Sequence, residues 1–482
     1  MGEPKKTMAI SGWGRFPVQE CSIYRPEGRR AVSEILAARE TPTLLARGLG
    51  RSYGDVSTNG GGGLILFERL DRILAFDDET GILRCEAGVS LATLIDIFLP
   101  RGYFLPVTPG TKFVTVGGAI AHDVHGKNHH RDGTFGDAVT SLELLLPNGE
   151  IMVCSREEHA DVFWATLGGI GLTGFILTAT IQLQPVESTY CVVDYVKCPN
   201  LDAALAALDE TEERYQYSVA WVDCLSRGAS LGRSVLMLGN HAAASDLTPR
   251  QPDPFSMAHR SEWSIPFDFP GFALNTWSVK AFNAVFNAMH KTVESTIEHF
   301  EPYFYPLDRI RHWNRMYGRR GFVQYQVTVP LDEQTGLARI LEATAASGRA
   351  SFLGVLKKFG PANEGLLSYP FAGYTLTLDI PVRNGLSEFL HELDGILLDH
   401  GGRLYTAKDA VMTEDAFRAM YPRMDEFLKI RNPGTLLGTR FEFQKHGEAG
   451  IEVTEGTDDD NKSRRVEGMI KFDDPEGTPT EI

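Results

Sequence analysis

Three glycine-rich segments in the first 174 residues most constrain what this 482-residue chain can fold into. They are Arg47–Asp55 (RGLGRSYGD), Pro109–His130, which contains Gly117-Gly118 and the run HGKNHH, and Gly168–Gly174 (GGIGLTG). Each glycine costs conformational entropy on folding, so three clusters within about 130 residues need a purpose beyond turn formation. Closely spaced glycines let backbone N–H groups converge on an anion such as a pyrophosphate. The segments predict a cofactor site, with a plain tight turn as the alternative for the first one.

The positions of these glycines disfavour the usual dinucleotide-binding fold. A G-x-G-x-x-G fingerprint beginning at Gly48 requires glycine at position 53, where this chain has Tyr53. Residues 43–186 have the pattern of short strands and hairpins, with a helix capped by Ser90 and a hairpin turn at Asn148-Gly149. This half is therefore predicted to be α+β, without a regular strand–helix–strand repeat.

Beyond residue 186 the pattern predicts helices packed on an antiparallel sheet. Residues 321–329 and 374–380 alternate like strands, whereas residues 201–215, 279–300 and 386–400 have helical spacing. The aromatic-rich stretch 255–272 lacks periodicity, and we leave it open whether it forms a loop, a lid or a membrane-contacting surface.

The length predicts two domains, because one hydrophobic core stops growing near about 250–300 residues. We expect the first domain at 9–186 and the second at 187–402, with 403–445 returning to the first. Residues 446–482 are acidic and aromatic-poor, which is typical of a disordered tail.

Charge and cysteine usage limit the partners and the compartment. The net charge of −16 argues against nucleic-acid binding, which needs a basic surface. No apolar run is long enough to span a membrane, and the chain begins without a signal-peptide pattern. The six cysteines are scattered, without metal-type spacing, which indicates reduced thiols. We expect a cytoplasmic protein that touches the inner face of the plasma membrane at most peripherally.

The order of these motifs resembles a known flavoprotein fold. Arg47–Asp55, then PGT…VGGAIAHDVHG, then GGIGLTG resemble the PCMH-type FAD-binding domain of the vanillyl-alcohol-oxidase family. The runs HGKNHH at 125–130, WNR at 313–315, QYQ at 324–326 and GRLYTAKD at 402–409 resemble its decaprenylphosphoryl-β-D-ribose 2-oxidase group. The similarity covers about residues 12–440. It implies a two-domain α+β fold, with a substrate domain of helices on an antiparallel sheet.

The resemblance implies that the glycine-rich segments and their neighbours bind FAD. Relatives that tether FAD covalently do so through a histidine where this chain has Arg51, so the resemblance implies non-covalent FAD, with His125 as a weaker alternative tether. The implied FAD-binding residues are Arg47, Gly48, Leu49, Gly50, Arg51, Ser52, Tyr53, Gly110, Thr111, Val114, Gly117, Gly118, Ala121, His122, Asp123, Gly126, Asn128, Ile176 and Tyr405.

The second domain is implied to hold a sugar phosphate. Cationic donors suit its phosphate, and neutral donors suit its hydroxyls. Thr377 stands where some relatives carry a cysteine, which puts thiol-directed inhibition in doubt and leaves the oxidation intact. The implied substrate-binding residues are Lys127, Asn314, Gln326, Lys357, Thr377 and Lys408.

Alcohol oxidation needs a base for the hydroxyl proton, and the sequence leaves three candidates. They are Lys408, Tyr405 and His125, any of which could act if its pKa lies near neutrality. His125 and His129 are four residues apart and could instead bind a metal, but no HExxH motif or carboxylate set accompanies them. We therefore predict no metal site.

The resemblance implies FAD-dependent oxidation of the C2 hydroxyl of a polyprenyl-phosphoryl-β-D-ribose. This step would begin an epimerisation that a separate NAD(P)H-dependent short-chain reductase completes, to supply arabinose for the cell-envelope arabinan. One alternative is a soluble polyol or aldonolactone oxidase of the same fold. The other is a non-catalytic flavin-binding subunit of a reductase.

Overall fold

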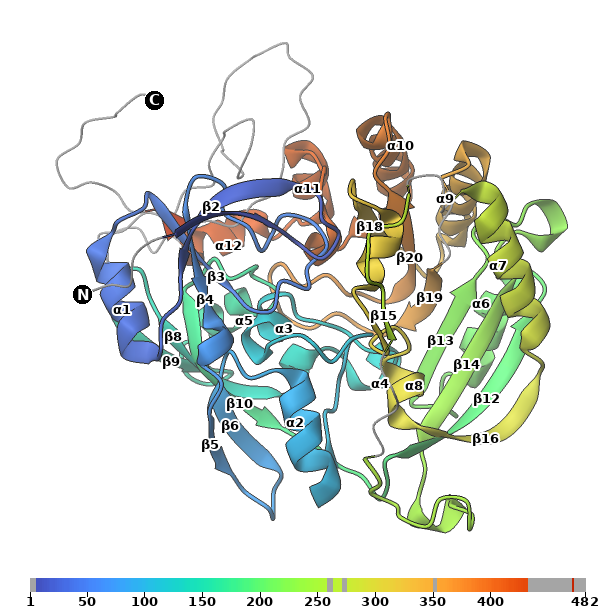
Figure 1. The fold of residues 1–482 in the computed structure, drawn as a ribbon, viewed down its shortest axis with the longest axis horizontal. Coiled ribbons are helices and arrows are strands. Elements are labelled where there is room, and N and C mark those ends of the chain that lie inside the picture. Colours follow the sequence, from blue (N-terminus) through green and yellow to red (C-terminus); the bar gives the residue numbers. More distant parts are fainter. Residues whose placement is uncertain (1–5, 258–262, 271–274, 350–352, 432–469, 472–482) are drawn as a thin grey trace.

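The computed structural model describes residues 6–257, 263–270, 275–349, 353–431 and 470–471. Two five-stranded sheets form the N-terminal part, on the left of Figure 1, and an eight-stranded sheet with its helices forms the rest. The expected α+β class is confirmed. Most of the acidic segment 446–482 lies outside the described residues.

The first sheet positions the first glycine-rich loop. Its strand order is β1-β2-β4-β3-β22, and β4 pairs in parallel with both β2 and β3. Helix α1 and the loop after β3 connect its strands, and this loop begins at Arg47, the last residue of β3. The bounds are β1 (Lys6–Ser11), β2 (Val18–Tyr24), α1 (Arg29–Ala38), β3 (Thr43–Arg47), β4 (Gly63–Leu66) and β22 (Ile470–Lys471).

The second sheet is antiparallel in the order β5-β6-β10-β8-β9. Ser90 caps α2 by accepting from Thr93 N at 3.0 Å, and Thr115 caps α3 by accepting from Gly118 N at 3.1 Å. The bounds are β5 (Ile73–Phe76), β6 (Ile82–Glu86), α2 (Leu91–Phe98), α3 (Val116–Ala121), β8 (Val139–Leu145), β9 (Ile151–Ser155), α5 (Ala160–Thr166) and β10 (Phe175–Gln182).

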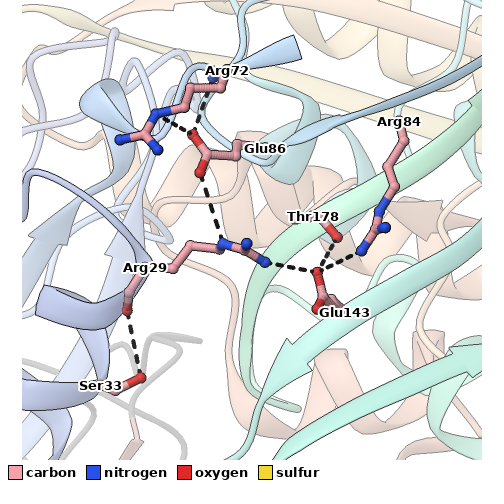
Figure 2. A network of polar contacts seen from close by, with 7 residues as sticks. All are labelled: Arg29, Ser33, Arg72, Arg84, Glu86, Glu143 and Thr178. Atoms are coloured by element: carbon pink, nitrogen blue, oxygen red, sulfur yellow. Dashed lines mark hydrogen bonds and ion pairs between the residues drawn. The ribbon is translucent and has the colours of Figure 1, made fainter. Parts of the chain in front are cut away.

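A network of charged side chains joins α1 to the second sheet (Figure 2). Arg29, at the start of α1, lies 3.1 Å from Glu143 of β8 and 3.9 Å from Glu86 of β6. Glu143 also accepts from Thr178 Oγ1 at 2.6 Å and from Arg84 at 3.1 Å. The network connects the two sheets of this part.

The third sheet is antiparallel throughout, in the order β16-β12-β14-β13-β19-β20-β18-β21. Helices α6, α9 and α10 supply apolar residues to the core on one of its faces. The strands are β12 (Tyr190–Cys198), β13 (Tyr217–Val222), β14 (Ser234–His241), β16 (Val293–His299), β18 (Phe322–Pro330), β19 (Gly354–Phe359), β20 (Gly373–Pro381) and β21 (Arg403–Leu404). The helices are α6 (Leu201–Thr211), α7 (Thr276–Met289), α8 (Phe300–Phe304), α9 (Gln334–Ser347), α10 (Leu386–Asp399), α11 (Glu414–Met420) and α12 (Met424–Arg431).

The expected helix over 279–300 is wrong beyond Met289. Helix α7 ends there, and residues 293–299 form edge strand β16, which pairs with β12. Helical spacing of apolar residues continues across this boundary, but Thr292, Val293, Thr296 and Ile297 are β-branched and favour a strand. Tertiary pairing with β12 decides the outcome.

Side chains of the third sheet alternate between an apolar face that forms the core and a face that lines a cavity. On β18, Val323, Tyr325 and Val327 join the helix-covered core, whereas Gln324 and Gln326 line a cavity on the opposite face. Because successive strand residues point to opposite faces, one sheet supplies both a core and a site wall.

The segment that follows β21, residues 405–412, packs against the first glycine-rich loop and is called the return segment below. Tyr53 N donates to Ala407 O at 3.0 Å. A Cβ built on Gly54 would lie only 1.4 Å from Asp409 O, so glycine is required for this close approach. The return segment therefore fixes the first glycine-rich loop against the third sheet.

Candidate active site

A cavity of about 600 Å³ runs between the three glycine-rich segments and the third sheet. Most of the residues expected from the sequence meet there. Those that line it are Arg47, Gly48, Leu49, Gly50, Arg51, Ser52, Tyr53, Gly110, Thr111, Val114, Gly117, Gly118, Ala121, His122, His125, Gly126, Lys127, Ile176, Gln326, Lys357, Thr377, Tyr405 and Lys408.

Three expected site residues do not line the cavity. Asp123 is buried and accepts from Gly136 N at 2.9 Å and from Ser368 Oγ at 2.5 Å. Asn128 donates to Pro106 O at 2.7 Å, and Asn314 donates to Trp13 O at 3.0 Å. Their side chains hold the surrounding loops together.

The first loop places a partly buried cation, Arg51, at the cavity wall. A Cβ on Gly48 would lie 2.2 Å from Thr115 Oγ1, so glycine lets this loop approach the segment that precedes α3. Arg47 donates to Ser11 O at 2.8 Å and thereby supports the loop from behind. The Arg51 guanidinium lies 4.0 Å from the ring centroid of Trp13 and faces the cavity.

Several buried nitrogens of this wall have no hydrogen-bond partner within the described protein. Among them are Arg51 Nε, His122 Nδ1 and His125 Nδ1. Unsatisfied buried polar atoms are costly, so they point to a polar group that binds between the loops. Cationic, neutral and backbone donors around glycine-rich turns fit a dinucleotide with a pyrophosphate and a polar ring.

Two of the histidines that line the cavity, His122 and His125, are neutral at physiological pH. Burial lowers the pKa of His122 to about 4, and it lowers the pKa of His125 well below its usual 6.5. Gln326 Nε2 lies 2.8 Å from His125 Nε2, where an amide N–H can donate to the neutral ring. His125 is thus already engaged at the nitrogen that would accept a proton.

Three lysines converge on the cavity from different elements. Burial lowers the pKa of Lys127 to about 8 and those of Lys357 and Lys408 to about 7. Lys127 Nζ lies 4.1 Å from the ring centroid of Tyr303 and donates to its backbone carbonyl. Lys357 Nζ lies 3.5 Å from Gly126 O, next to Lys127 in the chain.

Tyr405 and Lys408 come from the return segment and differ in what they can do. Tyr405 Oη donates to His122 O at 2.9 Å, and burial raises its pKa well above 10. Its ring stacks on Tyr369, with the centroids 4.5 Å apart. Lys408 Nζ lies 3.9 Å from the Tyr53 ring centroid and faces the cavity, and burial lowers its pKa to about 7.

Sequence reasoning missed several residues that line the cavity. Gln324 was detectable, because it shares the strand face of Gln326 at a spacing of two. The sequence gives no signal for Trp13, Asp308 and Tyr303, because no local pattern distinguishes them from core or surface residues. An apolar arm of the cavity is formed by Trp221, Phe282, Phe286, Leu353 and Val355.

Comparison with known proteins agrees with this geometry. Residues 22–155 match the FAD binding domain family. The chain is 41% identical over 434 residues to the decaprenylphosphoryl-beta-D-ribose oxidase of Mycolicibacterium smegmatis, covering 89% of this chain and 94% of that protein. It is 31% identical over 164 residues to the L-gulonolactone oxidase of Bos taurus, covering 34% of this chain and 37% of that protein. The chain therefore belongs to the decaprenylphosphoryl-β-D-ribose oxidase family and is an FAD-dependent oxidoreductase.

Proposed function

We propose that this protein oxidises the C2 hydroxyl of a polyprenyl-phosphoryl-β-D-ribose to the 2-keto sugar. The observation that carries the proposal is the convergence of Lys127, Lys357 and Lys408 with Gln326 on the wall that faces the glycine-rich loops. A plain polyol or lactone carries no phosphate that would use these partly buried ammonium groups. The similarity to a lactone oxidase covers only about a third of this chain, whereas that to the ribose oxidase covers 89%.

Lys127 and Lys357 are the proposed phosphate ligands. Each has a pKa lowered by burial, and Lys127 lowers that of Lys357 further, so the pair is costly to keep charged without an anion. A bound phosphate favours the charged form of both amines. Binding of substrate is therefore expected to raise both pKa values and to take up protons near pH 7.

Lys408 is the proposed base. Of the three candidates, Tyr405 is committed as a donor to His122 O, and His125 Nε2 is occupied by Gln326. The Lys408 amine has a pKa near 7 and can accept a hydroxyl proton in its neutral form. FAD held by the glycine-rich loops would supply the hydride acceptor for this oxidation. We propose Thr377 and Gln326 as contacts to the sugar.

We propose that the three glycine-rich segments hold FAD without a covalent bond. Arg51 replaces the histidine tether of the first loop, and a guanidinium forms no such bond. Its unpartnered Nε and the loop backbone suit a pyrophosphate, as do the neutral His122 and His125. FAD should therefore be released intact from the denatured protein.

Anaerobic mixing with a polyprenyl-phosphoryl-β-D-ribose tests the function. Bleaching of the flavin absorption band is expected, with a 2-keto sugar as product. Bleaching by xylitol or galactonolactone, with none by the lipid-linked ribose, would establish the polyol or lactone oxidase. No bleaching by any of the three would favour a non-catalytic flavin-binding subunit.

We propose two further features of the same reaction. A 2-keto product must be reduced from the other face to become an arabinose donor, so an NAD(P)H-dependent short-chain reductase is the proposed partner. A cytoplasmic location at the inner face of the plasma membrane suits a polyprenyl substrate. No helix in the described part of the chain is long and apolar enough to cross a bilayer. We propose helix α7 as the membrane contact.

A further inference from the structure

A carboxyl group lies behind the cavity wall that carries Lys408. Asp379 is on β20, two residues after Thr377, so both side chains lie on the same face of the strand. Asp379 is fully buried. Gln324, its register partner on β18, donates from Nε2 to Oδ1 at 2.6 Å, and Tyr317 donates from Oη to Oδ2 at 3.2 Å.

An aromatic cluster connects this carboxyl group to Lys408. The Tyr317 ring stacks on Phe322, with the centroids 4.0 Å apart. Phe322 meets Tyr53 edge-on at 5.5 Å, and Lys408 Nζ lies on the Tyr53 ring. The carboxyl group and the amine thus bracket one packed set of rings, which fixes both of them.

We propose that Asp379 is a positioning residue whose carboxylate holds the Lys408 ammonium group at the cavity wall. Asp379 and Lys408 interact electrostatically, and each favours the charged form of the other. Because Asp379 does not line the cavity, it acts through Lys408 and not on the substrate. The inference rests on the proposed function only where it treats Lys408 as the base.

The charges around Lys408 give the direction of the effect. Burial lowers the Lys408 pKa to about 7, Asp379 raises it, and Lys357 lowers it. His122 and His125 also face Lys408, but both are neutral. Without the carboxylate, the Lys408 pKa falls and the amine is less firmly held.

The surroundings of Asp379 show why its charge depends on its neighbours. Burial raises the Asp379 pKa to about 7, whereas Gln324, Lys408 and Tyr317 lower it in that order. Burial raises the pKa of the Tyr53 phenol well above 10 and Asp379 raises it further, so this phenol stays neutral. Removing a donor to the carboxyl group should weaken its hold on Lys408.

The test measures the Lys408 pKa directly in the FAD-loaded protein. The rate at which trace acetic anhydride labels the Lys408 peptide is followed from pH 5 to 10 by mass spectrometry, with the exposed Lys429 as reference. Asp379→Asn keeps the shape and should lower the Lys408 pKa by about one unit or more. The apparent pKa of the acidic limb of the pH–rate profile should fall by the same amount. The maximal kcat should fall about 10-fold, with KM changing little.

Two comparisons separate positioning from a merely structural effect. Asp394→Asn alters another buried carboxyl group, which Tyr325 holds at 2.9 Å, and should leave the Lys408 pKa unchanged. Asp379→Glu keeps a carboxylate and should give a Lys408 pKa close to that of the wild type. An unchanged Lys408 pKa in folded Asp379→Asn would overturn the proposal, and so would an equal fall in Asp394→Asn.

A second variant covers the case in which Asp379→Asn does not fold. Tyr317→Phe removes one donor to Asp379 and should lower the Lys408 pKa by a smaller amount, whereas no shift would overturn the proposal. The labelling needs no substrate, so its result is independent of whether a lipid-linked ribose is oxidised.

Discussion

At the scale of single residues, Lys408 decides whether the site can remove a proton. Lys408→Met keeps the apolar stem and removes the amine, so flavin reduction by substrate should slow by about 10²–10⁴-fold. The flavin absorbance of the purified variant should match the wild type, because the glycine-rich loops are unchanged. Stopped-flow absorbance measures both the rate of flavin reduction and the flavin content. Lys429→Met, on the exposed side of α12, is the matched control, and a fully active Lys408→Met would exclude Lys408 from the mechanism.

The pH dependence has a definite sign. Burial lowers the Lys408 pKa to about 7, and the base is the neutral amine, so kcat should rise as pH increases through about 7. An ammonium group that only binds substrate would instead leave kcat flat and make kcat/KM fall as pH rises. A pH–rate profile at saturating substrate distinguishes the two roles.

The sequence predicts single residues well where chemistry is concentrated in short motifs. HGKNHH and YTAKD contain His125, Lys127, Tyr405 and Lys408, and all four line the cavity. Asp379 could not be predicted in the same way. Its sequence context, an alternating strand, equally suits an exposed carboxylate, and only the pairing of β18 with β20 buries it beside Gln324.

At the scale of elements, Arg29 joins α1 to the second sheet. Arg29→Ala should cost about 1 kcal/mol of stability, because it removes one partner of Glu143 and one of the buried Glu86. For a domain of this size that is about 2–4 °C in melting temperature, measured by calorimetry of the holoprotein. Arg30→Ala is the matched control, because Arg30 is 93% exposed and pairs only within α1 among the described residues.

The same network predicts how the stability lost in Arg29→Ala varies with pH. Burial raises the pKa of Glu143, but Thr178, Arg29 and Arg84 outweigh it and hold the pKa below its usual value. The stabilisation is therefore present above the unfolded pKa and is lost as pH falls through the lowered folded one. The difference between Arg29→Ala and wild type should shrink below about pH 4. A constant difference down to pH 3 would show that Arg29 acts by packing.

Local signals predicted elements only where no tertiary contact competes. Ser90 capped α2 as expected, because an N-cap is decided within one turn. The helix expected over 279–300 is wrong over 293–299, because the apolar spacing there fits a helix while pairing with β12 requires a strand. The order of the eight strands was likewise beyond the sequence, since it depends on contacts between segments far apart in the chain.

At the scale of the whole molecule, the C-terminal segment carries nearly half of the net negative charge. Residues 446–482 hold 11 acidic and 4 basic side chains, so they carry −7 of the net −16 and leave −9 for the rest. The net negative charge of the rest of the chain gives no overall attraction to anionic lipids. Any docking must come from apolar side chains, and it should depend little on salt.

Helix α7 provides such a surface and should bind lipid. Trp277 is 82% exposed and Met289 is 76% exposed, while Phe282 is 45% exposed and also lines the apolar arm of the cavity. A polyprenyl chain leaving the cavity there would enter the bilayer beside α7, which lies on the right of Figure 1 and packs Phe286 against Trp221 of β13.

Replacing Trp277 and Met289 together by serine should therefore weaken sedimentation with phosphatidylcholine–phosphatidylglycerol vesicles by about 10-fold or more, because two large side chains lose their apolar burial. Oxidation of a short-chain, water-soluble substrate analogue should be unchanged, since neither residue lines the cavity. The matched control replaces Ile151 and Val153 of β9, which are 55% and 47% exposed far from α7 in the chain, and should sediment like the wild type. Equal binding by both double variants would show that α7 is not the docking surface, and the path of the polyprenyl chain would then have to leave the cavity elsewhere.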